Sequence, residues 1–241
     1  MPLLLKVAGW GEIRAHGRPD EANELDGGAK TERPDGAPKT ERPERLGTEQ
    51  AVGPRREIEM RLLEPGDAEA CYAAVERDRD YLREWLPWVD RTQAPGDIRT
   101  FIETVAIPQY EAGNGPNCGI WVDGEFAGSI GCHVIDWPNR NCSIGYWVSA
   151  GRQGKGIVTR CCATLLDYLF DELRLHRVTI DCGTENTRSC AIPERLGFRR
   201  EGVKRESQWV SGRWLDLVTW SMLDREWRER RDGRLPALAD L

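Results

Sequence analysis

A glycine-rich loop at residues 153–158 is the segment whose residue types and spacing could do chemistry. It has the sequence Gln-Gly-Lys-Gly-Ile-Val and separates a strand-like run, 144–148, from an amphipathic run that begins at Ile157. The first N–H groups of a helix have no partner inside it and carry partial positive charge, and glycines allow an anion to approach them closely. The loop matches neither the P-loop pattern nor the dinucleotide fingerprint. It therefore predicts another kind of phosphate site, with an ordinary tight connection as the alternative.

The composition limits the partners of such a site. The chain has a formal net charge of −6 and a pI near 5.3, whereas a duplex-binding surface needs clustered Lys and Arg. No apolar run approaches the roughly 18 residues of a membrane-spanning helix, and the first residues show no small-residue cleavage pattern. We therefore expect a cytoplasmic protein with no nucleic-acid partner and no membrane segment.

The eight cysteines do not form a metal-binding or disulfide pattern. They lie inside strand-like and helix-like runs, and no CxxC pair is present. We expect buried free thiols and no metal site.

The elements that position the loop lie in one part of the chain. Residues 1–56 are rich in Gly, Pro, Glu and Arg and, beyond the first few positions, lack apolar periodicity. The motif Lys-Thr-Glu-Arg-Pro occurs at 30–34 and again at 39–43, which is typical of low-complexity sequence. We predict a disordered low-complexity tail over 1–56, one α+β domain over 57–228 and a C-terminal tail over 229–241.

Hydrophobic periodicity and turn residues predict the order of elements within 57–228. Asp-Gly at 123–124 and Pro-Asn at 138–139 are turn signals that imply an antiparallel meander. Ser-Gly at 211–212 indicates a further hairpin. The predicted order is a strand (58–63), three helices (67–78, a short one over 81–90 that is broken at Pro87, and 96–113), three strands (118–122, 125–137, 140–148), a long amphipathic helix from 157, a strand (176–183), a helix (187–197) and a hairpin (198–223).

The loop and a downstream segment together resemble the GNAT superfamily of N-acetyltransferases. Gln153 and Gly156 match the first and fourth positions of the superfamily's [QR]xxGx[GA] coenzyme A loop, while Val158 departs from the usual Gly or Ala. Four further residues match the spacing of the NxxAxxxYExxGF segment: Asn186, Glu194, Gly197 and Phe198. Two motifs in the correct order make this resemblance specific.

A finer resemblance points to the ribosomal-protein N-terminal acetyltransferases. It is carried by segments that span nearly all of the predicted domain: 82–90, 133–140, 144–148, 153–157, 184–189 and 191–198. This branch implies a GNAT-like mixed, splayed central sheet flanked by helices, in which pantetheine inserts between the strands at 142–148 and 176–183. It also implies acetyl-CoA as co-substrate and a protein or peptide N-terminal α-amine as acceptor. Dimers are common in the branch, so a homodimer is among the expected assemblies.

The resemblance assigns the coenzyme to the loop, the strand before it and the start of a later helix. We expect acetyl-CoA to contact Trp147, Val148, Gln153, Gly154, Lys155, Gly156, Ile157, Val158, Asn186 and Ser189. For Asn186, a turn-forming role is the alternative.

Direct transfer in a ternary complex is the expected mechanism, because amine attack on a thioester needs no enzyme nucleophile. Many members of the superfamily protonate the departing thiolate with the Tyr of YExxGF, and Pro193 occupies that position here. Ser189 lies one helical turn earlier, and the branch uses such a Ser near the thiol, so Ser189 is the candidate proton donor. A Ser that caps or back-bonds the helix is the alternative.

The sequence leaves the general base open. Relatives often carry Glu in the strand before the IGYW segment, where this chain has Ser143. Glu185, His133 and Asp136 are the remaining candidates, each with a structural role as the alternative. A free α-amine has a pKa near 8, against about 10.4 for Lys, so a weak or water-relayed base suits an α-amine acceptor better.

Two tryptophans are candidates for the acceptor site. Trp85 and Trp88 flank Pro87, where aromatic side chains could form the edge of an acceptor groove or pack in the core. Two other functions remain open: an acetyltransferase for a small amine, antibiotic or toxic peptide, and a catalytically silent coenzyme A-binding domain used for sensing.

Overall fold

The structure, a computed structural model, describes residues 5–8 and 57–234. Most of the predicted N-terminal tail therefore lies outside the described residues. Four of its residues, Leu5–Ala8, form strand β1, which pairs in parallel with β2 (Ile58–Leu62). These four residues depart from the prediction that the whole of 1–56 is disordered.

The described strands form one mixed sheet of eight strands in the order β1-β2-β3-β4-β5-β6-β8-β7. The pairs β1–β2 and β5–β6 are parallel, and all other neighbours are antiparallel. The meander and the final hairpin are confirmed. The remaining bounds are β3 (Asn117–Val122), β4 (Glu125–Cys132), β5 (Asn141–Val148), β6 (Arg177–Gly183), β7 (Arg199–Val210) and β8 (Arg213–Leu223).

Strand β4 is shorter than predicted. The alternating pattern extends to Trp137, but β4 ends at Cys132. Residues 133–140 instead form a loop closed by an isolated antiparallel bridge between Asp136 and Asn141. The side chain of Asp136 also accepts hydrogen bonds from the backbone and side chain of Asn139, at 3.2 and 2.7 Å. Local bonds to a short polar side chain therefore replace strand pairing here.

The sheet splays between β5 and β6, as the GNAT resemblance implies. These parallel strands pair only over Asn141–Ser143 and Arg177–Thr179. Beyond Ser143, β5 still pairs with β4 up to Val148, and beyond Thr179, β6 still pairs with β8 up to Gly183. The facing edges of β5 and β6 therefore separate, and their backbone groups no longer bond to one another.

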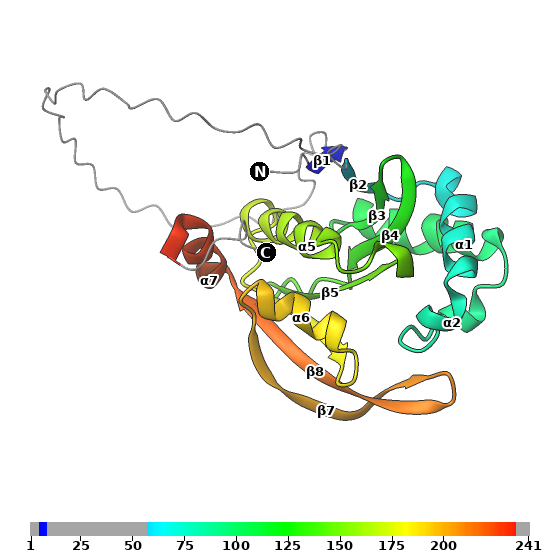
Figure 1. The fold of residues 1–241 in the computed structure, drawn as a ribbon. Helices are drawn as coiled ribbons and strands as arrows, with labels where there is room; N and C mark the ends of the chain where they lie inside the picture. The colour runs from blue at the N-terminus through cyan, green and yellow to red at the C-terminus, as the bar shows by residue number, and fades with distance from the viewer. Residues whose placement is uncertain (1–4, 9–56, 235–241) are drawn as a thin grey trace, which may run out of the picture. The chain divides into compact units, whose positions relative to one another are not determined.

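Helices cover both faces of the sheet (Figure 1). Helices α3 and α4 are continuous through the π-helical turn Ile102–Ala106, and α5 continues through a second one, Tyr168–Glu172. The α-helices are α1 (Ala68–Arg77), α2 (Arg79–Leu82), α3 (Pro95–Phe101), α4 (Ile107–Glu111), α5 (Ile157–Asp167), α6 (Thr187–Arg195) and α7 (Asp224–Glu229). Three 3₁₀ turns complete the set: Pro65–Asp67, Val89–Arg91 and Ala150–Arg152.

The short helix predicted over 81–90 is interrupted before Pro87, as expected, but it ends earlier than predicted. Helix α2 ends at Leu82, and turns lead to the 3₁₀ turn Val89–Arg91. Pro87 explains the break, because the residue before a proline is pushed out of the helical conformation and the proline itself has no N–H to donate.

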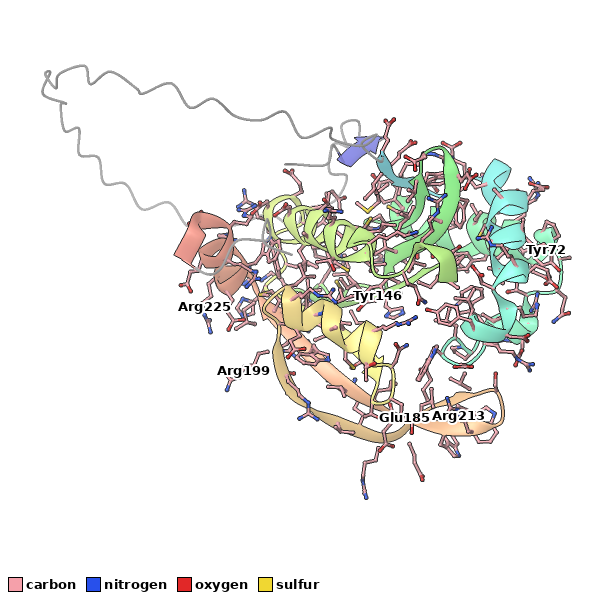
Figure 2. All side chains as sticks on the ribbon, in the orientation of Figure 1. Tyr72, Tyr146, Glu185, Arg199, Arg213 and Arg225 are labelled. Carbon is pink, nitrogen blue, oxygen red and sulfur yellow. The ribbon has the colours of Figure 1, made fainter. Side chains whose placement is uncertain are left out.

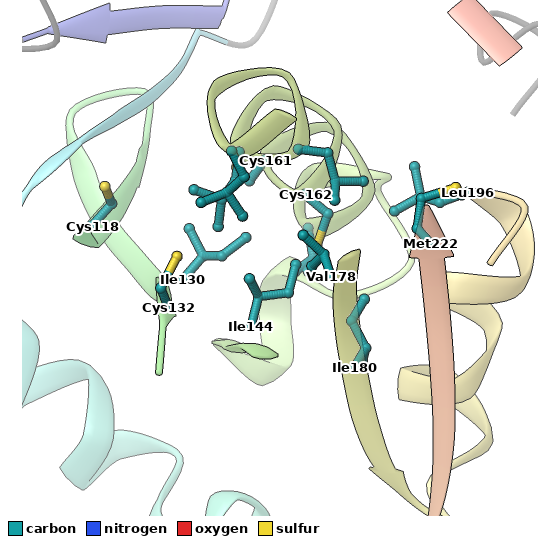
Figure 3. Packing of buried hydrophobic residues seen from close by; sticks show 14 of the residues in the cluster. Cys118, Ile130, Cys132, Ile144, Cys161, Cys162, Val178, Ile180, Leu196 and Met222 are labelled. Carbon is teal, nitrogen blue, oxygen red and sulfur yellow. The ribbon is translucent and has the colours of Figure 1, made fainter. Parts of the chain in front are cut away.

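Alternation along β5 divides the core between the two faces of the sheet. Ile144 packs in a cluster with α5 and β6, part of which is shown in Figure 3. Trp147 belongs to a second cluster with residues of α1 and α3. Strand β5 therefore contributes side chains to both clusters, one packed against α5 and the other against α1 and α3.

The eight cysteines are free, and all except Cys190 are buried, as predicted.

The C-terminal helix extends the predicted domain. Trp227 of α7 is buried and its indole N–H donates to Asp167 at 2.8 Å. The helix continues as a π-turn over Arg230–Arg234, and Arg231 pairs with Asp167 at 3.0 Å and with Asp171. The predicted boundary at 228 is therefore too early for the described part of the chain.

No helix within the described residues is long and apolar enough to cross a membrane. The same residues contain no group of three or more His, Cys, Asp or Glu side chains arranged to hold a metal ion.

Candidate coenzyme A and acceptor site

The glycine-rich loop has the backbone that an anion site requires. Gly154 and Gly156 have left-handed φ angles of +68° and +70°, which only glycine adopts without strain. Gly156 is the N-cap of α5, so the first N–H groups of that helix face the loop without an intrahelical partner. Among the described residues, the N–H groups of Gly154, Lys155 and Gly156 make no backbone hydrogen bond. Successive free amides at a helix start can bind phosphate oxygens.

Two loop residues contribute through the main chain only. The side chains of Ile157 and Val158 are 3% and 6% exposed and belong to the core under α5. Val158, which departs from the family pattern, is therefore directed into the core and does not obstruct the loop.

The side chain of Lys155 folds back onto the loop, where Nζ donates a hydrogen bond to the carbonyl of Gly151 at 2.5 Å.

A cavity of about 1350 Å³ connects the loop to the splayed strands. Both diverging strands line it, and it continues to residues of α3 on the other face of the sheet. Its basic residues lie at the loop and on α5 and α6: Arg152, Lys155, Arg160, Arg188 and Arg195. The positive charge is thus confined to one end of the cavity, where a polyanionic group would be stabilised.

Gln153 and Arg188 connect the loop to α6 across this basic end. A guanidinium nitrogen of Arg188 donates to Oε1 of Gln153. Nε2 of Gln153 is buried and has no hydrogen-bond partner among the described residues. An unpaired buried amide is costly, so this donor is suited to a ligand oxygen. The free loop amides, the guanidinium groups and the gap between β5 and β6 together fit the phosphates and the pantetheine of coenzyme A.

Ser189 lines the cavity. Its backbone N–H donates to Oδ1 of Asn186 at 3.0 Å, which makes Asn186 the N-cap of α6. The Ser189 hydroxyl is 3.3 Å from Sγ of Cys182 and 3.5 Å from the hydroxyl of Tyr146. Asn186 thus orients the turn that places Ser189 against β5 and β6.

Tyr146 is a site residue that the sequence analysis did not assign. It lies on β5, lines the cavity and donates to the carbonyl of Ser189 at 3.3 Å (Figure 2). Burial, with a smaller contribution from Cys182, raises the pKa of Tyr146 well above its usual range. Burial also raises the pKa of the Cys182 thiol to about 12. Both groups therefore stay protonated at neutral pH, which leaves Cys182 a poor nucleophile. The only sequence signal for Tyr146 was an aromatic residue in a strand beside the loop.

The three base candidates are not equivalent in the structure. Glu185 forms an ion pair with Arg213 at 3.3 Å, and its side chain is 73% exposed. Asp136 caps the 133–140 loop. His133 alone of the three lines the cavity, with Nδ1 2.5 Å from Oγ of Ser143.

The predicted acceptor tryptophans both line the cavity and also pack against the protein. Trp88 lies 6.1 Å from Trp147, centroid to centroid, on the face of the sheet that carries α1 and α3. Trp85 lies under the guanidinium of Arg213, 5.7 Å from the ring centroid. Trp147, predicted to contact the coenzyme, is on the same face as Trp88, whereas Val148 faces α5. Each tryptophan is therefore partly buried and also lines the cavity, and a role in binding the acceptor stays a prediction.

Known proteins share this sequence and fold. The acetyltransferase (GNAT) domain family model matches residues 57–199. The chain is 41% identical over 174 residues to the "Putative ribosomal N-acetyltransferase YdaF" of Bacillus subtilis (strain 168), covering 70% of this chain and 93% of the relative.

Two solved structures contain a coenzyme at this fold. The microcin C7 self immunity acetyltransferase MccE, in complex with acetyl-CoA and AMP, is 26% identical with a TM-score of 0.66, over 69% of this chain and 92% of that one. Mycobacterium smegmatis RimJ, in complex with CoA-disulfide, is 28% identical with a TM-score of 0.66, over 73% and 90%. The chain therefore belongs to the GNAT acetyltransferase family and is an acetyl-CoA-dependent N-acetyltransferase related to the ribosomal-protein N-acetyltransferases.

Proposed function

We propose that the enzyme transfers acetyl from acetyl-CoA to the N-terminal α-amine of a protein or peptide. The observation that carries this proposal is the division of the cavity. Its one lysine and its arginines lie at the coenzyme end, while the part beyond the gap between the strands has no lysine or arginine among the described lining residues and includes the aromatic side chains of Trp85, Trp88 and Phe101. Such a surface suits an uncharged peptide segment better than an anionic acceptor.

Both carboxylates among the described residues that line the cavity have hydrogen-bond or ion-pair partners, which supports the same acceptor. Asp97 lines the cavity, but its carboxylate accepts the N–H groups of Gln93 and Ala94 at 2.7 and 2.9 Å. Asp181 is paired with Lys204 at 2.9 Å. Without a strong base, the enzyme is better matched to an α-amine, of which roughly a tenth is neutral at pH 7, than to a lysine.

The residues of the cavity then have distinct tasks. The loop amides and the basic side chains bind the phosphates of acetyl-CoA, and the edges of β5 and β6 hold pantetheine. The amine nitrogen attacks the thioester directly, and Ser189 protonates the departing thiolate. The buried hydroxyl of Tyr146, 3.5 Å from Ser189, is placed to return a proton to it. The proposal also includes a cytoplasmic location and a homodimer, which sedimentation velocity would detect.

Acceptor identity can be tested with matched peptides. One peptide has a free N-terminus and no lysine, and the second has the same sequence with an acetylated N-terminus and one internal lysine. A panel of small amines and aminoglycosides completes the set. Mass spectrometry should show acetylation of the first peptide, with kcat/KM at least about 100-fold above that of the second.

Two results would contradict the proposal. Preferential acetylation of small amines or of lysine would assign a different acceptor class. Binding of acetyl-CoA without transfer to any amine would identify a coenzyme-binding domain with no activity.

A further inference from the structure

Ser143 and His133 form a polar pair on the acceptor face of the sheet. His133 directly follows β4, and its backbone N–H donates to the carbonyl of Ser143 at 2.8 Å. The side chains also meet, because Nδ1 of His133 lies 2.5 Å from Oγ of Ser143. Main-chain and side-chain contacts between the same two residues fix the imidazole relative to β5.

The pair lies where β5 and β6 begin to separate. Ser143 and Thr179 are the last residues that pair between these strands, and Gly145 follows two positions later on the same face of β5. A Cβ atom built on Gly145 would lie 3.7 Å from both Cε1 and Nε2 of His133. The imidazole therefore covers the glycine that borders the start of the gap. All three residues, His133, Ser143 and Gly145, line the cavity.

The contact with Ser143 admits both tautomers of the imidazole, because the hydroxyl can accept from Nδ1 or donate to it. The proposal below uses the tautomer that carries its proton on Nδ1. When Oγ of Ser143 accepts the Nδ1 proton, the lone pair of the imidazole is on Nε2, the atom that faces Gly145. The side-chain amide of Gln109, which also lines the cavity, is engaged with the carbonyl of Cys132 at 2.9 Å.

We propose that His133 is the general base of the transfer and that Ser143 is its positioning residue. This inference rests on the proposed function, in which an amine approaches from the acceptor face. As the N–C bond forms between the amine and the acetyl carbonyl and the C–S bond breaks, the amine proton passes to Nε2 of His133. The thiolate takes the proton of Ser189, which regains a proton from solvent by way of the Tyr146 hydroxyl 3.5 Å away. The proton held by His133 is released to solvent. The products are the acetylated amine and free coenzyme A, with no net change in the enzyme.

Chemical rescue tests the role of His133. His133→Ala should lower kcat by about 10²- to 10⁴-fold, the usual contribution of a positioned base, while leaving the affinity for acetyl-CoA unchanged in calorimetry. Added imidazole should raise the kcat of His133→Ala by at least about tenfold. The matched control is His176→Ala, since His176 is paired with Asp224 at 3.2 Å and does not line the cavity. Imidazole should not accelerate that variant.

Substitutions at Ser143 test positioning. Ser143→Ala should lower kcat about tenfold with little change in KM, and Ser143→Thr, which keeps the hydroxyl, should recover most of the rate. In a His133→Ala background, Ser143→Glu places a carboxylate on the same face and should recover activity without imidazole. His133→Gln removes the base but keeps a side chain close in size to His. This variant therefore shows whether activity is lost with the base or with the fold.

The assay uses the amine on which the wild type is fastest, so the acceptor and the base are tested separately. A preference for a small amine would overturn the acceptor assignment and leave the rescue pattern as the test of His133. A kcat for His133→Ala within about threefold of wild type would overturn the base assignment. Detection of acetyl-Ser143 by mass spectrometry would also overturn it, because Ser143 would then be a nucleophile activated by His133.

Discussion

At the scale of single residues, Ser189 uses its backbone and its side chain differently. Its N–H completes the cap made by Asn186, while its hydroxyl faces Cys182 and Tyr146. Capping therefore involves the backbone, and proton donation by the hydroxyl stays a proposal.

Ser189→Ala separates these two tasks, because alanine keeps the N–H and removes the hydroxyl. We expect kcat to fall by about 10² or more, within the roughly 3–5 kcal/mol that a positioned acid contributes to the barrier. Steady-state kinetics, calorimetry with acetyl-CoA and thermal melting measure the effect. Affinity and melting temperature should stay near those of the wild type. A kcat within about threefold of wild type would leave solvent, or Tyr146 acting directly, as the proton source.

Gly156→Glu tests the anion site. Gly156 has a φ of +70°, so a side chain strains the N-cap of α5, and a carboxylate places negative charge where the helix start favours phosphate. Binding of acetyl-CoA should be lost in calorimetry. Gly156→Ala is the matched control: it carries the backbone strain without the charge and should bind more weakly than wild type but measurably. Unchanged affinity in a folded Gly156→Glu would place the phosphates elsewhere.

At the scale of elements, the β7–β8 hairpin connects the coenzyme and acceptor sides. Its turn has positive φ at Ser211 and Gly212, +45° and +85°, as a two-residue hairpin turn requires. The Ser211 hydroxyl donates to the carbonyl of Arg83 at 2.7 Å and lies 3.1 Å from Asp90. The tip of the hairpin is thus attached to the segment that carries Trp85 and Trp88.

The base of the same hairpin is held by a charge network that should make stability depend on pH. Two guanidinium nitrogens of Arg177 on β6 donate to Glu201 on β7 at 2.7 and 2.6 Å, and Ser221 on β8 donates to Glu201 at 2.8 Å. The hydrogen bonds from Arg177, followed by that from Ser221, lower the pKa of Glu201 to about 2 from an ordinary 4.5. Because the pKa of Glu201 is lowered in the folded protein, its ionised carboxylate stabilises the fold. This stabilisation is complete above pH 4.5 and is lost as the pH falls toward 2.

Glu201→Gln should therefore melt at a lower temperature than wild type at pH 7. The difference between the two melting temperatures should shrink as the pH falls from about 4.5 to about 2. The Glu201 side chain is 38% exposed, so solvent screening keeps the effect modest. Calorimetric melts at several pH values measure it. A difference between the two proteins that is constant over this range would show that the ion pair does not control stability.

At the scale of the whole molecule, the sheet separates two core clusters, and the cavity reaches both faces at the gap between β5 and β6. The cluster under α5 supports the glycine-rich loop, and the cluster with α1 and α3 supports the face where we propose that the acceptor binds. Near the edge of the sheet formed by β1 and β2, Ile58 and Met60 of β2 are buried in the cluster under α5. The strand before β2 in the chain, β1, pairs only with β2 and adds to that edge.

Deletion of residues 1–56 should leave turnover and fold largely intact, because β2 keeps its pairing with β3 and its core side chains. Thermal melting and steady-state rates of the truncated and full chains test this. A fall in melting temperature of more than about 4 °C, roughly 1 kcal/mol for a domain of this size, would show that β1 contributes to stability. A large loss of turnover would show that the segment acts on the site.

The sequence by itself determined the features that depend on neighbouring residues. The loop at 153–158, the amphipathic helix after it and the turns at 123–124 and 211–212 depend on glycine, apolar spacing and short polar side chains, and all are present in the structure. The sequence pattern predicted β4 too long, because local hydrogen bonds to Asp136 end regular structure earlier. It correctly predicted a break at Pro87, although α2 ends already at Leu82.

Only the tertiary structure decided which polar groups meet. His133 and Ser143 are ten residues apart, Ser189 and Tyr146 forty-three, and Gln153 and Arg188 thirty-five. Their contacts depend on strand register and on the point where β5 and β6 stop pairing, which are set by the packing of both faces of the sheet. Glu185 shows the same dependence: it is close to the site in sequence, but the hairpin brings Arg213 to it and its side chain is exposed. Residue types therefore indicated the chemistry, while the register and splay of the sheet selected the residues placed to perform it.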